Sequence, residues 1–309
     1  MDKPAVISIT GPSATGKTEL SVNLARKFDG EIVSADSRYI YKEIDIAAAK
    51  PSEKEKQGIK HYFIDVCDVA SVYTAGSYAK DATETIRNIV KSGKLPIVTG
   101  GTGLYTRALY GDFDIPKVPP DEKLRTELKK KSNEELFQML QKLDPEAAQK
   151  IHPNNTVKVV RALEVSLITG KKMSEQQLQK TPDFDFLKII LDVKNRDFLY
   201  EKINLRTEKM FENGLEQEAK KLFEKYGKND ILMNTIGIKE FYDYFYGDRP
   251  FEEVVRLVKQ DTRRYSKRQI SWFSKEQGAM RFYIDEMNPE QIFEEISRAT
   301  EKCIGQKTR

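Results

Sequence analysis

The stretch that decides the fold begins Ala5-Val-Ile-Ser-Ile-Thr10, an apolar run rich in β-branched residues. It continues as Gly11-Pro-Ser-Ala-Thr-Gly-Lys17-Thr18, and Glu19-Leu-Ser-Val-Asn-Leu-Ala-Arg26 follows with apolar residues at helical spacing. The order is therefore strand, glycine-rich turn and helix. The turn fits G-x-x-x-x-G-K-[ST] at every fixed position and has the flanking strand and helix that this phosphate-binding motif requires.

This phosphate loop predicts a site for a chain of phosphates. Glycines let the loop bend so that its N–H groups point at phosphate oxygens, and the helix N-terminus adds partial positive charge. Lys17 supplies a full charge, and the Thr18 hydroxyl suits Mg²⁺. The predicted phosphate-binding residues are Gly11, Pro12, Ser13, Ala14, Thr15, Gly16, Lys17 and Thr18.

The motif alone does not specify a triphosphate. A kinase or NTPase normally also needs a Mg²⁺-binding carboxylate at the end of an apolar strand. Asp192 ends the apolar run Lys188-Ile-Ile-Leu-Asp192 and is one candidate. A strand-end or turn role is the favoured alternative for this aspartate.

Outward from the motif, strand-like and helical segments alternate. Further strands are predicted at 31–35, 61–65, 95–99 and 188–193, with a helix from about Thr74 to Val90. Such alternation predicts an α/β fold, here a P-loop NTPase-like core with a parallel sheet and right-handed crossovers.

The rhythm changes near residue 112, where a proline-rich connector precedes polar, helical segments. One begins with a capping box at 132–135, and another covers 155–167 and is closed by Gly170. We therefore predict a core made of 1–112 and 188–309 and a helical insertion domain at 113–187. The C-terminal part, about 197–303, is predicted to be mostly helical.

Composition limits the class of protein. The 309 residues are 39% hydrophobic and 32% charged with a net charge of +4, which suits a globular protein and does not by itself demand a nucleic-acid partner. No stretch approaches the roughly 20 apolar residues of a membrane span, and the first apolar run is too short for a signal segment. Two distant cysteines and two histidines suggest neither a zinc site nor a disulfide framework. We expect a cytoplasmic monomer.

A second glycine turn and an acid are the next candidates. Gly100-Gly-Thr-Gly103 follows the 95–99 strand, and Asp36 follows the 31–35 strand. Ligands of open α/β sheets bind beyond the carboxyl ends of the strands, so both segments should face one crevice. Thr102 could offer its hydroxyl to a phosphate or a base, and Asp36 could accept a proton from a nucleophile. A plain loop and a helix N-cap or turn are the alternatives.

Basic residues gather near the C-terminus, with aromatic residues between them. Such a helix can track a phosphate backbone, although a solvated face with salt bridges explains the pattern equally well. For Arg161, the pattern favours a pair with Glu164 at i, i+3 over contact with a substrate. The basic positions on the predicted helix face are Arg256, Lys259, Arg263, Arg264, Lys267 and Arg268.

Taken together, these motifs resemble the bacterial tRNA dimethylallyltransferases. The matching pieces occur in the family's order over nearly the whole chain. The phosphate loop is shared with many ATP-binding proteins, whereas the other pieces together are far more specific. They are 11–18, Asp36-Ser37 with Tyr41, 49–51, 61–65, 100–105, 161–165, 235–237, Lys239-Glu240, 262–269 and Trp272-Phe273.

The resemblance implies that dimethylallyl diphosphate binds on the phosphate loop with Mg²⁺, and that Lys17 stabilises the leaving diphosphate. It implies an acceptor, N6 of adenosine 37, flipped out of its stack in tRNAs with adenosines at positions 36, 37 and 38. Asp36 resembles the family's general base and Thr102 its partner, while the insertion helps to grip the anticodon stem-loop. The implied tRNA-binding residues are Asp36, Ser37, Arg38, Tyr39, Thr102, Val159, Val160, Arg161, Ala162 and Leu163.

The chain departs from the family pattern at four places, none of which is Lys17, Asp36 or the glycine turn. Tyr39 replaces a usual glutamine, so no base contact is carried over to that position. Ala47-Ala48 replaces glycine-threonine, Lys158 replaces an arginine, and Tyr62 replaces a second histidine.

Three rival functions share part of this pattern. An enzyme that prenylates free adenine nucleotides would need the phosphate loop and the acid, but neither the insertion nor the basic helix. A small-molecule kinase would need a triphosphate donor. An RNA-binding module would bind without chemistry, so substitution of Asp36 separates it from an enzyme.

Overall fold

The computed structural model of the protein describes residues 3–111, 118–176 and 181–305. Its sheet has the order β3-β2-β4-β1-β5-β6, and all paired strands run parallel, so the predicted parallel α/β core is confirmed. The strands are β1 (Ala5–Thr10), β2 (Gly30–Ser34), β3 (His61–Tyr62), β4 (Leu95–Gly100), β5 (Asp185–Asp192) and β6 (Met280–Tyr283).

Strand β6 is a strand that the sequence did not predict in a C-terminal part that is otherwise mostly helical, as expected. Residues 197–303 were predicted to be mostly helical, but Met280–Tyr283 extends the sheet by pairing with β5. The pairing matches Ile189 with Met280 and Asp192 with Tyr283. This short segment gains its hydrogen bonds from β5, which lies far away in the sequence, so local periodicity carries little sign of it.

The chain divides into two compact units, Met1–Thr106 with Asp183–Arg309, and Arg107–Pro182. These bounds lie a few residues before the predicted limits of the insertion, 113 and 187. Helix α4 (Gly103–Tyr110) begins in the first unit and ends in the second. The second unit contains α5 (Glu122–Lys129), α6 (Asn133–Leu143), α7 (Pro145–Lys150), α8 (Thr156–Thr169) and α9 (Met173–Gln176).

The first unit adds helices before and after the strands of its sheet. None of its described helices, nor any described helix of the second unit, has the length and apolar character needed to cross a membrane. They are α1 (Lys17–Lys27), α2 (Glu53–Lys56), α3 (Ala75–Lys91), α10 (Arg196–Glu212), α11 (Leu215–Tyr226), α12 (Asp230–Met233), η1 (Lys239–Phe241), α13 (Tyr242–Tyr246), α14 (Phe251–Phe273) and α15 (Pro289–Gly305).

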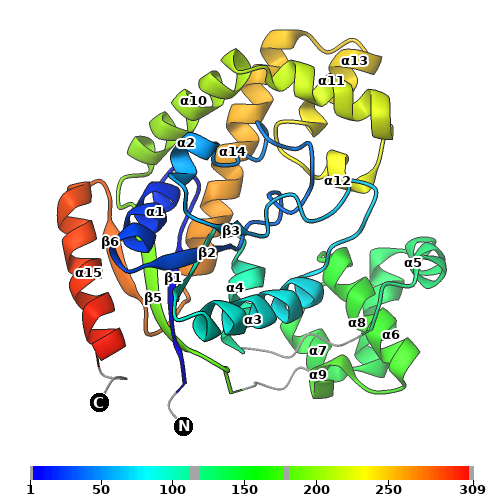
Figure 1. Ribbon diagram of the computed structural model, residues 1–309. Coiled ribbons are helices and arrows are strands. Elements are labelled where there is room, and N and C mark those ends of the chain that lie inside the picture. Colours follow the sequence, from blue (N-terminus) through cyan, green and yellow to red (C-terminus); the bar gives the residue numbers. More distant parts are fainter. Residues whose placement is uncertain (1–2, 112–117, 177–180, 306–309) are drawn as a thin grey trace. The chain divides into compact units, whose positions relative to one another are not determined.

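Alternation along the central strand β1 explains the main core. Ile7 and Ile9 point to one face of the sheet, where they pack with Leu24 of α1 and Ile296 of α15. Figure 1 shows α1 and α15 together on that side. These side chains are fully buried or nearly so, and each such burial contributes about 1.5–3 kcal/mol.

The second unit has its own core. Leu136 and Leu140 of α6 pack against Val159 and Leu163 of α8. The predicted capping box at 132–135 begins α6, and α8 ends at Gly170, which adopts a left-handed conformation with φ of 67°. Both ends of this helical pattern were therefore correctly predicted.

Two glycines let the site-bearing loops leave the sheet in close contact with neighbouring backbone. A Cβ at Gly11 would lie 2.1 Å from the carbonyl oxygen of Leu191, and one at Gly100 would lie 2.2 Å from that of Ala35. Backbone oxygens cannot move aside as a flexible side chain can. The exit of β4 is therefore pressed against the segment that follows β2.

Gly100→Ala tests this constraint. The added methyl group must displace the backbone at Ala35, so we expect the free energy of unfolding to fall by about 1–3 kcal/mol in urea denaturation. Gly305→Ala in α15 is the matched control, because nothing lies within 4 Å of its Cβ position; its effect should stay within about 0.5 kcal/mol. Equal stability of the two variants would contradict the argument.

Candidate active site

The loops after β1, β2 and β4 meet at one edge of the sheet. The Ser37 N–H donates to the Thr102 hydroxyl at 3.0 Å, and the Thr102 N–H donates to the Ala35 carbonyl at 3.1 Å. The glycine turn is thus bonded directly to the turn that carries the acid. The structure brings together the two turns that were predicted to face one crevice.

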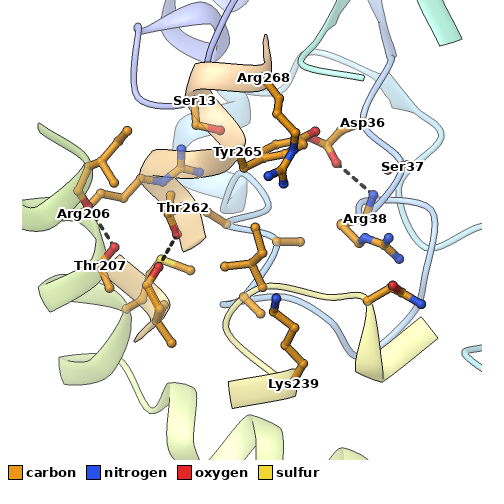
Figure 2. Close-up of a pocket in the computed structure, with 18 of the residues that line it drawn as sticks. Ser13, Asp36, Ser37, Arg38, Arg206, Thr207, Lys239, Thr262, Tyr265 and Arg268 are labelled. Carbon is orange, nitrogen blue, oxygen red and sulfur yellow. Dashed lines mark hydrogen bonds between the residues drawn. The ribbon is translucent and has the colours of Figure 1, made fainter. Parts of the chain in front are cut away.

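A cavity of about 310 Å³ opens beside these loops. Figure 2 shows side chains from the acid turn, α10 and α14 around it, with Lys239 rising from below. One acid and four cations line it: Asp36, Arg38, Arg206, Lys239 and Arg268. Part of the wall is apolar and consists of Ile203, Met210, Met233, Ile236 and Val258. This excess of positive charge favours an anionic ligand, and the apolar wall suits a hydrocarbon group.

In the phosphate loop, Ser13 lines the cavity. The Lys17 Nζ folds back to donate to the Pro12 carbonyl at 2.5 Å. Burial and, to a smaller extent, the nearby Arg206 lower the pKa of Lys17, Asp36 partly opposes them, and the net value is about 7. Lys17 is therefore a buried cation that an incoming anion would stabilise.

The Asp36 carboxylate points toward the cavity from a turn. Its Oδ1 accepts the Arg38 N–H at 2.8 Å, and no helix begins there in the described chain. Asp36 therefore starts a turn and is not a helix N-cap. Tyr265 of α14 lies nearby, and burial together with the charge of Asp36 raises the pKa of this phenol to about 12. The phenol stays protonated at neutral pH and can act as a hydrogen-bond donor.

Thr102 is not among the cavity-lining residues. Its hydroxyl accepts the Ser37 N–H and lies close enough to Tyr265 to lower the pKa of that phenol. In this structure Thr102 therefore supports the turn that carries Asp36 and does not face the cavity.

Tyr39, the departure from the family pattern, also has a bracing contact. Its hydroxyl donates to the Ala49 carbonyl at 2.8 Å, and burial and the charge of Asp36 raise its pKa. The loop that it reaches is anchored separately by Glu218, whose carboxylate accepts three backbone N–H bonds, from Asp45, Ile46 and Ala47. Tyr39 thus connects the acid turn to a second cavity wall, 47–49.

Asp192 has a structural role. It is buried at the end of β5 and forms an ion pair with Arg281 of β6, while its Oδ1 accepts the Val193 N–H. The favoured strand-end role therefore agrees with the structure. Among the described residues, no group of three or more acidic, histidine or cysteine side chains is arranged to hold a metal ion.

The side chains of the α8 segment are mostly buried. Val159, Val160, Ala162 and Leu163 are at most 8% exposed and belong to the core of the second unit, and their contact with tRNA stays a prediction. Arg161 is partly exposed, but it bonds to Glu164 and to the Val118 carbonyl. The pair favoured by the i, i+3 spacing is present.

The basic face of α14 is largely paired with other side chains. Arg256 pairs with Glu253, Lys259 with Glu208 of α10, and Arg263 with Asn204 of α10. Arg268 of the predicted basic face lines the cavity, together with Val258, Thr262 and Tyr265 of the same helix. With Arg264 paired to Asp261, the salt-bridged alternative describes three of the six predicted basic positions.

Arg206 is a site residue that the sequence reading missed. It lies on α10 with Ile203 and Met210 at i−3 and i+4, and all three line the cavity. That spacing becomes informative only once α10 is known to border the site. Lys239 belongs to a quoted motif, but no role followed from the sequence.

Comparisons with known proteins agree with this geometry. The family model described as IPP transferase matches residues 39–276. The tRNA dimethylallyltransferase of Caldanaerobacter subterraneus subsp. tengcongensis is 40% identical over 306 residues, covering 94% of this chain and 97% of the relative. That of Acetivibrio thermocellus is 43% identical over 278 residues, covering 87% and 88%.

Two solved structures are also similar. The full-length tRNA isopentenylpyrophosphate transferase of Bacillus halodurans matches with a TM-score of 0.75 at 34% identity, covering 99% of this chain and 98% of that one. A eukaryotic dimethylallyltransferase acting on tRNA matches with a TM-score of 0.76 at 32% identity, covering 87% and 70%.

The acid next to Lys239 in the sequence, Glu240, is buried. The Glu240 Oε2 accepts the Gly237 N–H at 2.8 Å, whereas Oε1 has no hydrogen-bond partner among the described residues. Burial raises the pKa of Glu240 to about 7. Because folding raises this pKa, the carboxyl stabilises the fold at low pH and loses that contribution as the pH rises through about 7.

Glu240→Gln should therefore raise stability more at pH 8 than at pH 5. We expect the gain over the parent protein to grow by an amount on the order of 2 kcal/mol between these pH values, measured by urea denaturation. Glu224→Gln on an exposed position of α11 is the control and should show no such trend. A gain for Glu240→Gln that does not change with pH would count against the raised pKa.

Proposed function

The chain belongs to the IPP transferase family of tRNA dimethylallyltransferases, and from that premise we propose that it transfers a dimethylallyl group from dimethylallyl diphosphate to N6 of adenosine 37 in tRNA. The observation that carries the proposal is the cavity. It combines Ser13 of the phosphate loop, one carboxylate, several cations and an apolar wall in a single space.

The donor end of the reaction falls to the phosphate loop and its neighbours. The diphosphate is taken up by the loop N–H groups, Lys17 and Arg206, which together stabilise the negative charge that develops as the allylic C–O bond breaks. Lys17 exchanges its bond to the Pro12 carbonyl for one to phosphate. The apolar side chains around Ile203 and Met210 shield the prenyl carbon from water, which would otherwise hydrolyse the cation.

The residues present fit a Mg²⁺ ion held mainly by the diphosphate. Magnesium commonly keeps several waters and uses one or two protein ligands beside substrate phosphates. Thr18 at the first turn of α1 is the protein ligand that we propose. When bound, the ion would neutralise part of the charge on the leaving diphosphate.

The acceptor end falls to Asp36. As N6 attacks the prenyl carbon, an N–C bond forms, the C–O bond to the diphosphate breaks, and Asp36 accepts the proton from N6. Thr102 and Ser37 hold the acid turn in place, and Tyr265 can donate to either reactant. The base must leave its stack to reach this position.

The second unit supports a large acceptor. We propose that it grips the anticodon stem-loop of tRNAs with adenosines at positions 36 to 38, with Arg161 stabilising the segment before α5 through Val118. An enzyme that prenylates a free nucleotide would not need such a unit to bind its acceptor. The kinase alternative is disfavoured because Asp192 is committed to Arg281. The monomeric state and the cytoplasmic location stay predictions.

Asp36→Asn tests the proposed base. Incubation with dimethylallyl diphosphate, Mg²⁺ and unmodified tRNA should give isopentenyladenosine with the parent protein and about 100-fold less or lower with the variant. AMP as acceptor should give none. The product is measured by mass spectrometry of digested nucleosides.

The asparagine variant should still bind tRNA, because it keeps the shape of the turn. Asp248→Asn, at an exposed position before α14, is the control and should keep full activity. Product from AMP alone would indicate a nucleotide prenyltransferase. Full activity of Asp36→Asn would overturn the assignment of the base.

The low pKa of Lys17 predicts proton uptake when the diphosphate binds. With a pKa of about 7, only about a tenth of the Lys17 side chains are protonated at pH 8, and the anion should restore the charge. Calorimetric titration with inorganic diphosphate, in buffers of different ionisation enthalpy, should therefore show more protons taken up by the parent protein than by Lys17→Met. The comparison cancels the ligand's own protons. An equal proton count in both proteins would contradict the lowered pKa.

A further inference from the structure

Gln269 occupies an unusual place between two loops of the site. This residue of α14 is 5% exposed. Its Oε1 accepts the Ser13 N–H at 2.9 Å and the Ser13 hydroxyl at 3.3 Å, while its Nε2 donates to the Gly101 carbonyl at 2.9 Å. One amide therefore connects the phosphate loop after β1 with the glycine turn after β4.

The bonds leave little freedom in how the amide is oriented. One partner is an N–H donor and the other is a carbonyl acceptor, so the side chain must present its oxygen to Ser13 and its nitrogen to Gly101. An ionised carboxylate has no proton to donate, and a lysine or arginine has no acceptor. A neutral carboxamide satisfies both partners at once.

The glycine turn is shaped to receive this helix. A Cβ at Gly101 would lie 2.2 Å from the Gln269 Nε2, and a Cβ at Gly103 would lie 2.1 Å from the Trp272 Nε1. Gln269 and Trp272 are three residues apart on α14, so both lie on the face that approaches the turn. The two missing side chains therefore let α14 approach to hydrogen-bonding distance.

The two connected loops carry the two ends of the site. Ser13 lines the cavity from the phosphate loop. On the other side, Thr102 follows Gly101 directly and accepts the Ser37 N–H next to Asp36. A change in the spacing between these loops would move the donor phosphates relative to the carboxylate.

We propose that Gln269 is a positioning residue, whose amide sets the spacing between the phosphate loop and the turn that supports Asp36. It touches neither reactant, and its effect on the reaction rests on the function proposed above. A displacement of about 1 Å between reacting groups can cost on the order of 100-fold in rate, so one amide in this position has a large effect.

Gln269→Glu gives the sharpest test, because a protonated glutamic acid is a close match in shape and hydrogen bonding to glutamine. Ionised, it loses the bond to Gly101 and places negative charge beside the phosphate loop. We expect kcat to fall about tenfold or more at pH 8 and the KM for dimethylallyl diphosphate to rise, with tRNA affinity unchanged. As the pH falls through the pKa of the introduced carboxyl, which burial at this position raises, the ratio of variant to parent kcat should climb back toward one.

Gln260→Glu is the matched control, because it adds the same charge to the same helix away from the cavity-lining residues. Its ratio to the parent should not change with pH. A loss in Gln269→Glu that is equally large at every pH would reduce Gln269 to a packing role and overturn the proposal. So would parent-like kinetics at pH 8.

A second pair of variants tests the contact without relying on catalysis. Gly101→Ala should push the amide away, and Gln269→Ala removes the group that it strikes. The double variant should therefore be more stable to urea than the sum of the two single losses predicts, by about 0.5 kcal/mol or more. Additive losses would show that Gly101 and Gln269 are not in contact and would overturn the proposal. If the two substitutions are coupled but the parent protein makes no product, the contact stands and the proposed function is refuted.

Discussion

The active site depends on backbone approaching backbone where the strands end. Gly11 leaves β1 with its hydrogen facing the Leu191 carbonyl of β5, and Gly100 leaves β4 against the Ala35 carbonyl. Since β4 lies between β1 and β2 in the sheet, these two contacts fix both the phosphate loop and the turn after β2. Any side chain at either glycine would force the loops apart. The site is thus assembled by the order of the strands and by two positions that lack a Cβ.

The cavity gathers several cations around a single acid, and this repulsion affects the ionisation of Lys17. Arg38, Arg206, Lys239 and Arg268 face a space that contains one acid, Asp36, and Lys17 is buried close to Arg206. Burial and like charge lower the pKa of Lys17, which disfavours its charged form. We propose that a bound diphosphate offsets this effect, because its negative charge stabilises the protonated lysine.

The sequence predicted those parts of the fold whose signals are local. The strand, loop and helix around Gly11–Thr18, the capping box before α6 and the glycine that ends α8 all depend on neighbours within a few residues. The sequence did not predict features that depend on contacts between residues far apart in the chain. Strand β6 exists because β5 accepts it, and Arg206 faces the cavity because α10 packs against α14. The burial of α8 residues such as Ala162 was also not predicted, because resemblance marks a segment and does not say which side of a helix points inward.

Ion pairing distinguishes the carboxylates that stabilise the fold from the one that is available for the reaction. Asp192 and Glu164 both looked like candidates for a role or a partner, and each is buried against arginine, Asp192 with Arg281 and Glu164 with Arg125 and Arg161. A carboxylate held in this way cannot accept a proton without breaking an ion pair. Asp36 differs, because its carboxylate accepts a backbone N–H and, among the described residues, has no ion-pair partner within 4 Å. It therefore keeps an oxygen available in a cavity that four cations line.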